Sequence, residues 1–219
     1  MKFTKDELRR SMLLYAVTDR SWLWGRTLVQ DVETVLKNGA TFLQIREKEL
    51  DDGTFLAEAK ALKTLAGQYR VPFVVNDNID IALQCDADGV HVGQSDIVGK
   101  DVRAVIGPDK ILGISANTVQ TALAAQAAGA DYIGVGAVFG TTTKKDAKNL
   151  TVPQLREICD AVDIPVVAIG GVSTSNIAQL AGSGVDGVAV VSALFAAADI
   201  GAATRELLEK SKIMVASHG

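Results

Sequence analysis

One alternation runs through this whole chain: a short apolar segment followed by a stretch of helical character, repeated eight times within 219 residues. Four of the apolar segments follow a small residue and often an Asp, in the sequences GATFLQ, ADGVHV, GADYIG and GVDGVA. Strands that alternate with helices form parallel βα units. Eight such units predict a single-domain (β/α)8 TIM barrel over residues 1–219, with a short extra helix near residues 5–10 at the N-terminus.

The expected elements follow from hydrophobic periodicity and from Gly, Pro and Asn breaks. Strands are expected at residues 13–18, 41–46, 72–76, 88–92, 110–115, 131–135, 165–169 and 186–191. Helices are expected at residues 27–37, 52–69, 79–83, 99–106, 119–128, 152–162, 175–181, 192–195 and 201–212. A doubly wound open sheet is the main competitor, but no GxGxxG motif follows the first strand.

Charge and composition narrow the classes of partner. The net charge is -4 and no basic tract is present, which argues against nucleic acid as a partner. No apolar run is long enough to span a membrane, and residues 1–14 do not resemble a signal peptide, so a cytoplasmic protein is expected. Cys85 and Cys159 are far apart and lack neighbouring ligands, which predicts reduced thiols. No pattern decides between a monomer and a homo-oligomer.

Polar side chains gather where the expected strands end, which is where barrel enzymes place their active sites. Taken singly, each is as easily explained as a turn former or a helix cap. The residues are Gln44, Arg46, Lys48, Asn76, Asp77, Asp96, Ser115, Thr141, Thr142, Thr143 and Lys144.

The segment TFLQIREK, residues 41–48, is the most informative of these strand ends. Gln44, Arg46 and Lys48 occupy alternate positions, so on a strand they project from one side and present two cations. Asp77 and Asp96 offer the hard oxygen ligands that suit Mg²⁺. With Lys144 adding charge and Asn76 and Ser115 adding neutral donors, the set predicts a site for a metal-bound diphosphate.

A second anion site is expected on the other side of the same opening. Gly170-Gly171 and Val191-Ser192 follow the seventh and eighth strands and precede expected helices, whose first N–H groups bind phosphate. The simpler alternative is that the two glycines only permit a tight turn. The long polar segment 136–149 is expected to be a working loop or lid.

No acid–base or nucleophilic pair can be assembled from the sequence. His91 interrupts an apolar strand and is interpreted as structural, and Glu47 lies beside the cations, with no nucleophile partner evident for either. Trp22 and Trp24 are expected to pack a helix onto the barrel, although one of them shielding a ligand is an alternative.

The chain resembles the thiamine-phosphate synthase family along essentially its whole length. The residues that carry the resemblance are YAVTD at 15–19, QIREK at 44–48, VNDN at 75–78, DGVHVGQSD at 88–96, GIS at 113–115, FGTTTKKDA at 139–147, AIGGV at 168–172 and VVS at 190–192. Gly140 departs from the family pattern, which more often has Pro there, and this predicts a more flexible loop.

The resemblance implies an Mg²⁺-dependent transferase of the alkyl- and aryl-transferring class. It would join 4-amino-5-hydroxymethyl-2-methylpyrimidine diphosphate to 4-methyl-5-(2-hydroxyethyl)thiazole phosphate, giving thiamine phosphate and pyrophosphate through a short-lived pyrimidine cation. The resemblance also implies one role for each residue of the site. Gln44 would contact the pyrimidine; Arg46, Lys48, Asn76, Ser115 and Lys144 would hold the diphosphate; Asp77 and Asp96 would hold Mg²⁺; and Thr141, Thr142, Thr143, Gly171, Val191 and Ser192 would receive the thiazole phosphate.

Three other functions are compatible with the same barrel fold. A thiazole tautomerase-like relative would need no diphosphate and metal cluster, and a sugar-phosphate epimerase or isomerase would need an acid–base pair that the sequence does not show. A non-catalytic ligand-binding barrel is a further alternative.

Overall fold

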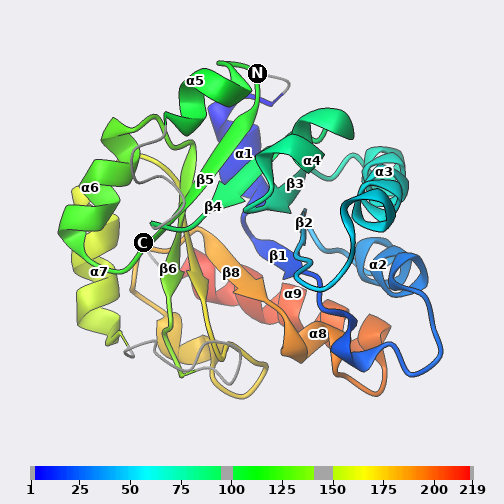
Figure 1. Cartoon of the computed structure of the whole chain (residues 1–219). Coiled ribbons are helices and arrows are strands. Elements are labelled where there is room, and N and C mark those ends of the chain that lie inside the picture. The colour runs from blue at the N-terminus through cyan, green and yellow to red at the C-terminus, as the bar shows by residue number, and fades with distance from the viewer. Residues whose placement is uncertain (1–2, 95–100, 141–149, 218–219) are drawn as a thin grey trace.

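Eight parallel strands close into one barrel in the computed structural model, which describes residues 3–94, 101–140 and 150–217 (Figure 1). The strands are β1 (Leu14–Val17), β2 (Phe42–Ile45), β3 (Phe73–Asn76), β4 (Gly89–Val92), β5 (Ile111–Ala116), β6 (Tyr132–Gly136), β7 (Val166–Ile169) and β8 (Gly187–Val190). Each strand pairs with the next, and β1 pairs with β8 through Ala16 and Val190 to close the ring. The predicted (β/α)8 barrel is therefore confirmed.

Helices surround the barrel, with α6 and α7 on one side and α2 and α3 on the opposite side (Figure 1). The α-helices are α1 (Lys5–Ser11), α2 (Leu28–Lys37), α3 (Asp52–Tyr69), α4 (Ile79–Gln84), α5 (Val102–Ile106), α6 (Val119–Ala127), α7 (Val152–Ala161), α8 (Ser192–Phe195) and α9 (Ile200–Ala216), and the short 3₁₀ helices are η1 (Arg20–Trp22) and η2 (Ile177–Leu180). Within the described part of the chain, no helix is long and apolar enough to cross a membrane.

Local sequence explains where these helices begin. Thr27 caps α2 through the N–H of Gln30, and the Gln30 side chain accepts in return from the Thr27 N–H. Asp51 caps α3 by accepting from the N–H of Thr54. These reciprocal bonds satisfy the first N–H groups of a helix, which have no partner within it. The apolar faces of the helices then pack on the outward-facing side chains of the strands.

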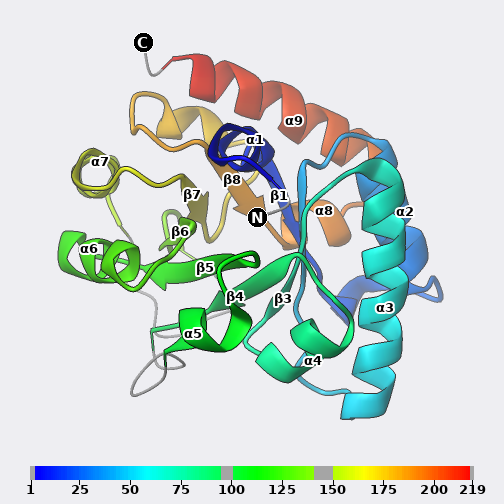
Figure 2. The same cartoon turned by 90° about the horizontal axis from the view of Figure 1, so that it is seen from above.

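The short N-terminal helix has a clear structural task. Leu8 and Met12 are buried and pack with Tyr15, Phe42 and Tyr132, which point into the barrel. Figure 2 shows α1 beside β1 and β8, inside the arc of the outer helices. Because α1 leads directly into β1, it covers the end of the barrel where the strands begin and leaves the opposite end open to ligands.

Two expected boundaries were wrong. β2 ends at Ile45, so the cations that follow it lie beyond the strand and not on its alternating face. The expected helix at residues 175–181 is only the four-residue 3₁₀ helix η2, which begins at Ile177 and ends at Leu180. Between β1 and α2, Asp19 caps η1 by accepting from the N–H of Ser21.

Candidate active site

The two cations after β2 differ in their surroundings. Arg46 is half-buried, its N–H donates to Thr18 Oγ1 at 3.0 Å, and its guanidinium lies 3.9 Å from a carboxylate oxygen of Asp19. Lys48 is exposed. Arg46 is therefore held by the end of β1, whereas Lys48 reaches into solvent from the loop that follows β2.

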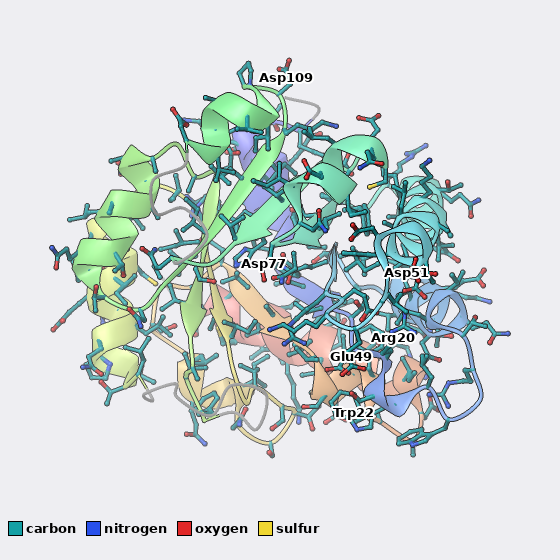
Figure 3. The ribbon with its side chains drawn as sticks, in the orientation of Figure 1. Arg20, Trp22, Glu49, Asp51, Asp77 and Asp109 are labelled. Atoms are coloured by element: carbon teal, nitrogen blue, oxygen red, sulfur yellow. The ribbon has the colours of Figure 1, made fainter. Side chains whose placement is uncertain are left out.

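Glu47, which lies between these cations, has partners that the sequence did not reveal. Arg20 Nε donates to Glu47 Oε2 at 2.5 Å, and Arg20 Nη2 donates to Glu58 Oε2 at 2.6 Å. The other oxygen of Glu47 accepts from the N–H groups of Lys48 at 2.9 Å and Glu49 at 3.2 Å. Figure 3 places Arg20 and Glu49 together on the α2 and α3 side of the molecule. Arg20 thus connects the end of β1 to the loop that carries Arg46 and Lys48.

The two carboxylates that flank Arg20 have pKa values shifted in opposite directions. Burial raises the pKa of Glu47, but the hydrogen bonds from Arg20 and from two backbone N–H groups outweigh it, so its pKa lies below the usual value. Burial also raises the pKa of Glu58, and there Arg20 does not compensate, so that pKa lies above the usual value. Glu47 is therefore the carboxylate that Arg20 holds in the charged form.

Asn76 and Asp77 lie at the end of β3, where the sequence placed them. Asn76 Nδ2 donates to Asp77 Oδ2 at 2.7 Å, and the Asp77 N–H donates to the backbone oxygen of His91. Asp77 is exposed and has a φ of 60°, a conformation that Asp and Asn tolerate better than most residues. Figure 3 shows Asp77 near the centre of the molecule, over the barrel strands.

These residues fit a metal that needs few protein ligands. No group of three or more His, Cys, Asp or Glu side chains that could hold a metal ion exists within the described ranges. Mg²⁺ is bound in many enzymes by one or two carboxylates, with water and substrate phosphate completing the octahedron. Asp77, exposed at a strand end, has the chemistry of such a carboxylate. Asp96, the second predicted ligand, lies outside the described residues.

Five inward-facing side chains form one chain of hydrogen bonds across the barrel. Gln44 Nε2 donates to the Tyr15 hydroxyl at 2.6 Å, and that hydroxyl lies 2.7 Å from the Tyr132 hydroxyl. Tyr132 lies 3.0 Å from His91 Nδ1, and His91 Nε2 lies 3.0 Å from Ser115 Oγ. Two predicted site residues, Gln44 and Ser115, are therefore joined through three side chains that the sequence did not place in the site.

The expectation that His91 has no nucleophile partner was wrong. His91 pairs with Gly113 in the sheet, so Ser115, two residues further along β5, points inward beside it. The other ring nitrogen of His91 bonds to the Tyr132 hydroxyl and not to a carboxylate. A Ser-His-Asp triad is therefore not formed by this pair. Strand alternation could have found the contact, because His91 and Ser115 both occupy inward positions on neighbouring strands.

Burial keeps the two tyrosines of this hydrogen-bond chain neutral. Tyr15 and Tyr132 are fully buried, and burial raises the pKa of each hydroxyl far above its usual value. The backbone also makes room for the rings, because a Cβ on Gly113 would overlap the Tyr132 ring and a Cβ on Gly134 would come within 3.1 Å of the His91 ring. Two glycines are thus required for the positions of Tyr132 and His91.

The predicted phosphate side of the opening has a fixed backbone. Gly170 and Gly171 have positive φ angles, and a Cβ on Gly171 would overlap the backbone oxygen of Gly140. Asn176 Nδ2 donates to the Gly171 oxygen at 2.8 Å, and this contact was not predicted. Val191 precedes α8, and Ser192 is its first residue and is exposed. Because η2 and α8 have four residues each, only their local N–H groups, and little helix dipole, are available to an anion.

Both stems of the predicted lid are anchored. The Leu150 N–H donates to the Ala137 oxygen at 2.8 Å, and the Phe139 N–H donates to the Gly170 oxygen at 3.0 Å. Gly140 has a φ of 74°, which proline cannot adopt because its ring fixes φ near -65°. The remaining predicted residues of this loop lie outside the described residues, and they are Thr141, Thr142, Thr143 and Lys144.

The two tryptophans behave differently. Trp22 packs against the core between the helices and the barrel, as expected. Trp24 is 62% exposed and contacts the Arg26 guanidinium at 5.5 Å from its ring, so the expectation that it packs a helix onto the barrel was wrong. Both cysteines are free, as the sequence predicted.

Comparison with known proteins gives a consistent result. The family model described as thiamine monophosphate synthase matches residues 14–194. A thiamine-phosphate synthase of Ruminiclostridium cellulolyticum is 48% identical over 90% of this chain and 93% of its own length, and one of Clostridium tetani is 46% identical over 89% and 93%. The solved thiamine phosphate pyrophosphorylase of Pyrococcus furiosus is 38% identical, covers 95% of this chain and 99% of its own, and superimposes with a TM-score of 0.87. The chain therefore belongs to the thiamine monophosphate synthase family.

Proposed function

We propose that this chain is a Mg²⁺-dependent thiamine-phosphate synthase. It joins 4-amino-5-hydroxymethyl-2-methylpyrimidine diphosphate to 4-methyl-5-(2-hydroxyethyl)thiazole phosphate and releases pyrophosphate. The observation that carries the proposal is the series of hydrogen bonds from Gln44 to Ser115, whose Gln44 end lies on β2, the neighbour of the strand that ends in Asn76 and Asp77. A neutral amide, a hydroxyl and a carboxylate thus meet at one opening, with Arg46 and Lys48 on the adjoining loop.

The proposal gives each residue of the site a role. Gln44, buried inside the barrel, contacts the pyrimidine ring, and Arg46, Lys48, Asn76 and Ser115 hold the diphosphate. Lys144 adds a further positive charge from the loop after β6. The thiazole phosphate binds on the opposite side, at backbone N–H groups of Gly171, Val191 and Ser192 and at the hydroxyls of Thr141, Thr142 and Thr143.

Asp77 and Asp96 would hold Mg²⁺ at the diphosphate. When bound, the ion neutralises negative charge on the leaving pyrophosphate. The protein's own cations do the same from Arg46, Lys48 and Lys144. In the reaction the bond between the exocyclic CH₂ and the diphosphate oxygen breaks, both electrons leave with pyrophosphate, and the thiazole nitrogen supplies the pair for the new C–N bond.

The reaction depends on charge stabilisation and on exclusion of water more than on proton transfer. The pyrimidine amino group donates electron density toward the CH₂ as the diphosphate leaves, and water would quench the resulting cation. An anchored loop after β6 suits a cover for this step. The relatives are named as synthases, which favours this activity over the tautomerase, the sugar-phosphate epimerase or isomerase and the non-catalytic alternatives.

The substitution Asp77→Asn tests the metal role, because Asn also tolerates a positive φ but carries no charge. Turnover should fall by about 100- to 1000-fold, since one charged contact to a developing anion is worth about 3–4 kcal/mol. Asp109→Asn, in the segment before β5 at the other end of the barrel, is the matched control and should keep full activity (Figure 3). Wild-type turnover in Asp77→Asn, or undiminished activity after chelation of Mg²⁺, would contradict the proposal.

A further inference from the structure

The interior hydrogen-bond chain has a direction that its chemistry imposes. It begins at Gln44 Nε2, an amide nitrogen that can only donate, so the Tyr15 oxygen must accept. A phenol has one proton, and the neighbour of Tyr15 on the other side is the Tyr132 hydroxyl. Tyr15 therefore donates to Tyr132, and Tyr132 in turn donates to His91 Nδ1. A neutral imidazole that accepts at Nδ1 carries its proton on Nε2, which then donates to Ser115 Oγ.

The opposite direction leaves a buried proton without an acceptor. If Ser115 donated to His91 Nε2, the imidazole proton would lie on Nδ1 and point at Tyr132, which would then donate to Tyr15. Tyr15 would receive two donors, and its own proton would have no acceptor among its recorded contacts. Tyr15 is 1% exposed, and an unmade buried hydrogen bond costs about 1–3 kcal/mol. With the Gln44 amide nitrogen facing Tyr15, as in the structure, the first direction is the one that gives every proton of the series an acceptor.

We propose that this directed chain sets the hydrogen-bonding character of the two residues at its ends, and that Tyr15, Tyr132 and His91 are positioning residues. At one end Ser115 accepts from His91 Nε2, so its own proton is available to an anionic oxygen. At the other end the amide nitrogen of Gln44 donates to Tyr15, so the amide oxygen of Gln44 is the atom that accepts from the amino group of a substrate ring. This assignment of ligand chemistry rests on the proposed function.

The two ends match the two kinds of group on the proposed donor substrate. An aminopyrimidine needs an acceptor for its amino group, and a diphosphate needs donors for its oxygens. The fold also holds the middle of the chain rigidly. Gly113 and Gly134 leave room for the Tyr132 and His91 rings, and any side chain at Gly113 would displace Tyr132. The direction is thus built into the barrel before a substrate arrives.

The tautomer of His91 tests the direction of the hydrogen-bond chain directly, and no substrate is needed to measure it. The protein has two histidines, so His218→Ala leaves His91 as the single histidine signal in a ¹⁵N-labelled sample. Two-bond ¹H–¹⁵N correlation should show a protonated Nε2 and an unprotonated Nδ1. Tyr132→Phe removes the donor to Nδ1 and should abolish this bias, whereas Tyr69→Phe, the third tyrosine, on α3, should preserve it. A protonated Nδ1 in the parent protein, or an unchanged bias in Tyr132→Phe, would overturn the proposal.

Kinetics test the consequence for substrate. Tyr132→Phe keeps the ring but breaks the chain, so kcat should fall by about fivefold to tenfold, the worth of one hydrogen bond, with little change in KM. Tyr69→Phe should leave both constants unchanged. If Tyr132→Phe does not fold, Tyr15→Phe breaks the chain one link earlier and should give the same fall in kcat, while the Tyr132 hydroxyl still donates to His91 Nδ1 and preserves the tautomer. A wild-type kcat in a folded chain-breaking variant would contradict the positioning role.

The activity measurement and the tautomer measurement together separate this inference from the proposed function. A parent protein that makes no thiamine phosphate contradicts the proposed function, and the His91 tautomer then decides the inference about the chain alone. A parent protein that is active but has its proton on Nδ1 contradicts the inference and leaves the proposed function standing.

Discussion

Arg20 Nε donates to Glu47 Oε2 at 2.5 Å, although the two residues follow different strands and are 27 positions apart. The Glu47 side chain is only 5% exposed and the Arg20 side chain is 30% exposed. This pair ties the end of β1 to the loop after β2. The loop that carries Arg46 and Lys48 is therefore held by a residue of η1, which follows a different strand.

Removing this arginine should weaken both the fold and the activity. Arg20→Met leaves Glu47 and Glu58 without their cation, and breaking such a partly buried pair should lower the free energy of unfolding by about 3 kcal/mol. The loop should also shift, and since a misplacement of about 1 Å can cost about 100-fold in rate, kcat/KM should fall by at least about tenfold. Urea unfolding and steady-state kinetics measure the two effects.

Arg156→Met is the matched control, because its ion pair with Asp160 is 3.8 Å long and both side chains are mostly exposed. It should change the unfolding free energy by less than about 0.5 kcal/mol. Equal effects of the two substitutions would refute the special role of Arg20.

The opposite pKa shifts beside Arg20 predict opposite pH dependences of stability. The folded pKa of Glu47 lies below the 4.5 of an ordinary glutamate, so its contribution is present above that pH and is lost as the pH falls. The folded pKa of Glu58 lies above 4.5, so its contribution is present at low pH and is lost as the pH rises.

Unfolding free energies at about pH 4 and about pH 6 test this pair of signs. The gain in stability on going from the lower to the higher pH should be smaller in Glu47→Gln than in the wild type, and larger in Glu58→Gln. Each variant also loses a bond to Arg20, but that loss affects both pH values and does not alter the sign of the comparison. Changes of the same sign in both variants would show that the two carboxylates are not distinguished by their surroundings.

A methyl group at Gly113 should disturb the barrel interior. Gly113→Ala places a Cβ against the Tyr132 ring, and such overpacking should cost about 1–3 kcal/mol. Gly67→Ala, within α3, meets no atom within 4 Å and should stabilise the protein by up to about 1 kcal/mol because alanine favours helix. Thermal unfolding of the two variants compares them, and a Gly113→Ala protein as stable as the wild type would show that Tyr132 can move.

Much of the fold could be predicted because the repeated βα unit is visible in the sequence. Buried parallel strands are continuous apolar runs, and Gly, Pro and Asn separate them from the helices, so eight βα units are visible without any contact information. The end of β2 was misjudged because alternation was continued past Ile45, where strand pairing stops. The short η2 was misjudged because the apolar pattern of residues 175–181 does not distinguish a short 3₁₀ helix from an α-helix.

The candidate site could be predicted only where polar residues follow strands. Asn76, Asp77 and Ser115 were predicted in this way, and the structure places them at the ends of β3 and β5. Arg20 was missed because its partner Glu58 lies on α3, and no local pattern links them. Tyr15 and Tyr132 were missed because, in an apolar strand, an inward tyrosine looks like any other core residue until its hydroxyl finds a partner across the barrel.

Pyrophosphate release is the measurement that tests the central claim most directly. The purified chain, given the pyrimidine diphosphate and Mg²⁺, should release pyrophosphate rapidly only after thiazole phosphate is added, and thiamine phosphate should form in equal amount. Release that does not depend on thiazole phosphate, or conversion of the thiazole phosphate without pyrophosphate release, would contradict the assignment of this chain as a thiamine-phosphate synthase.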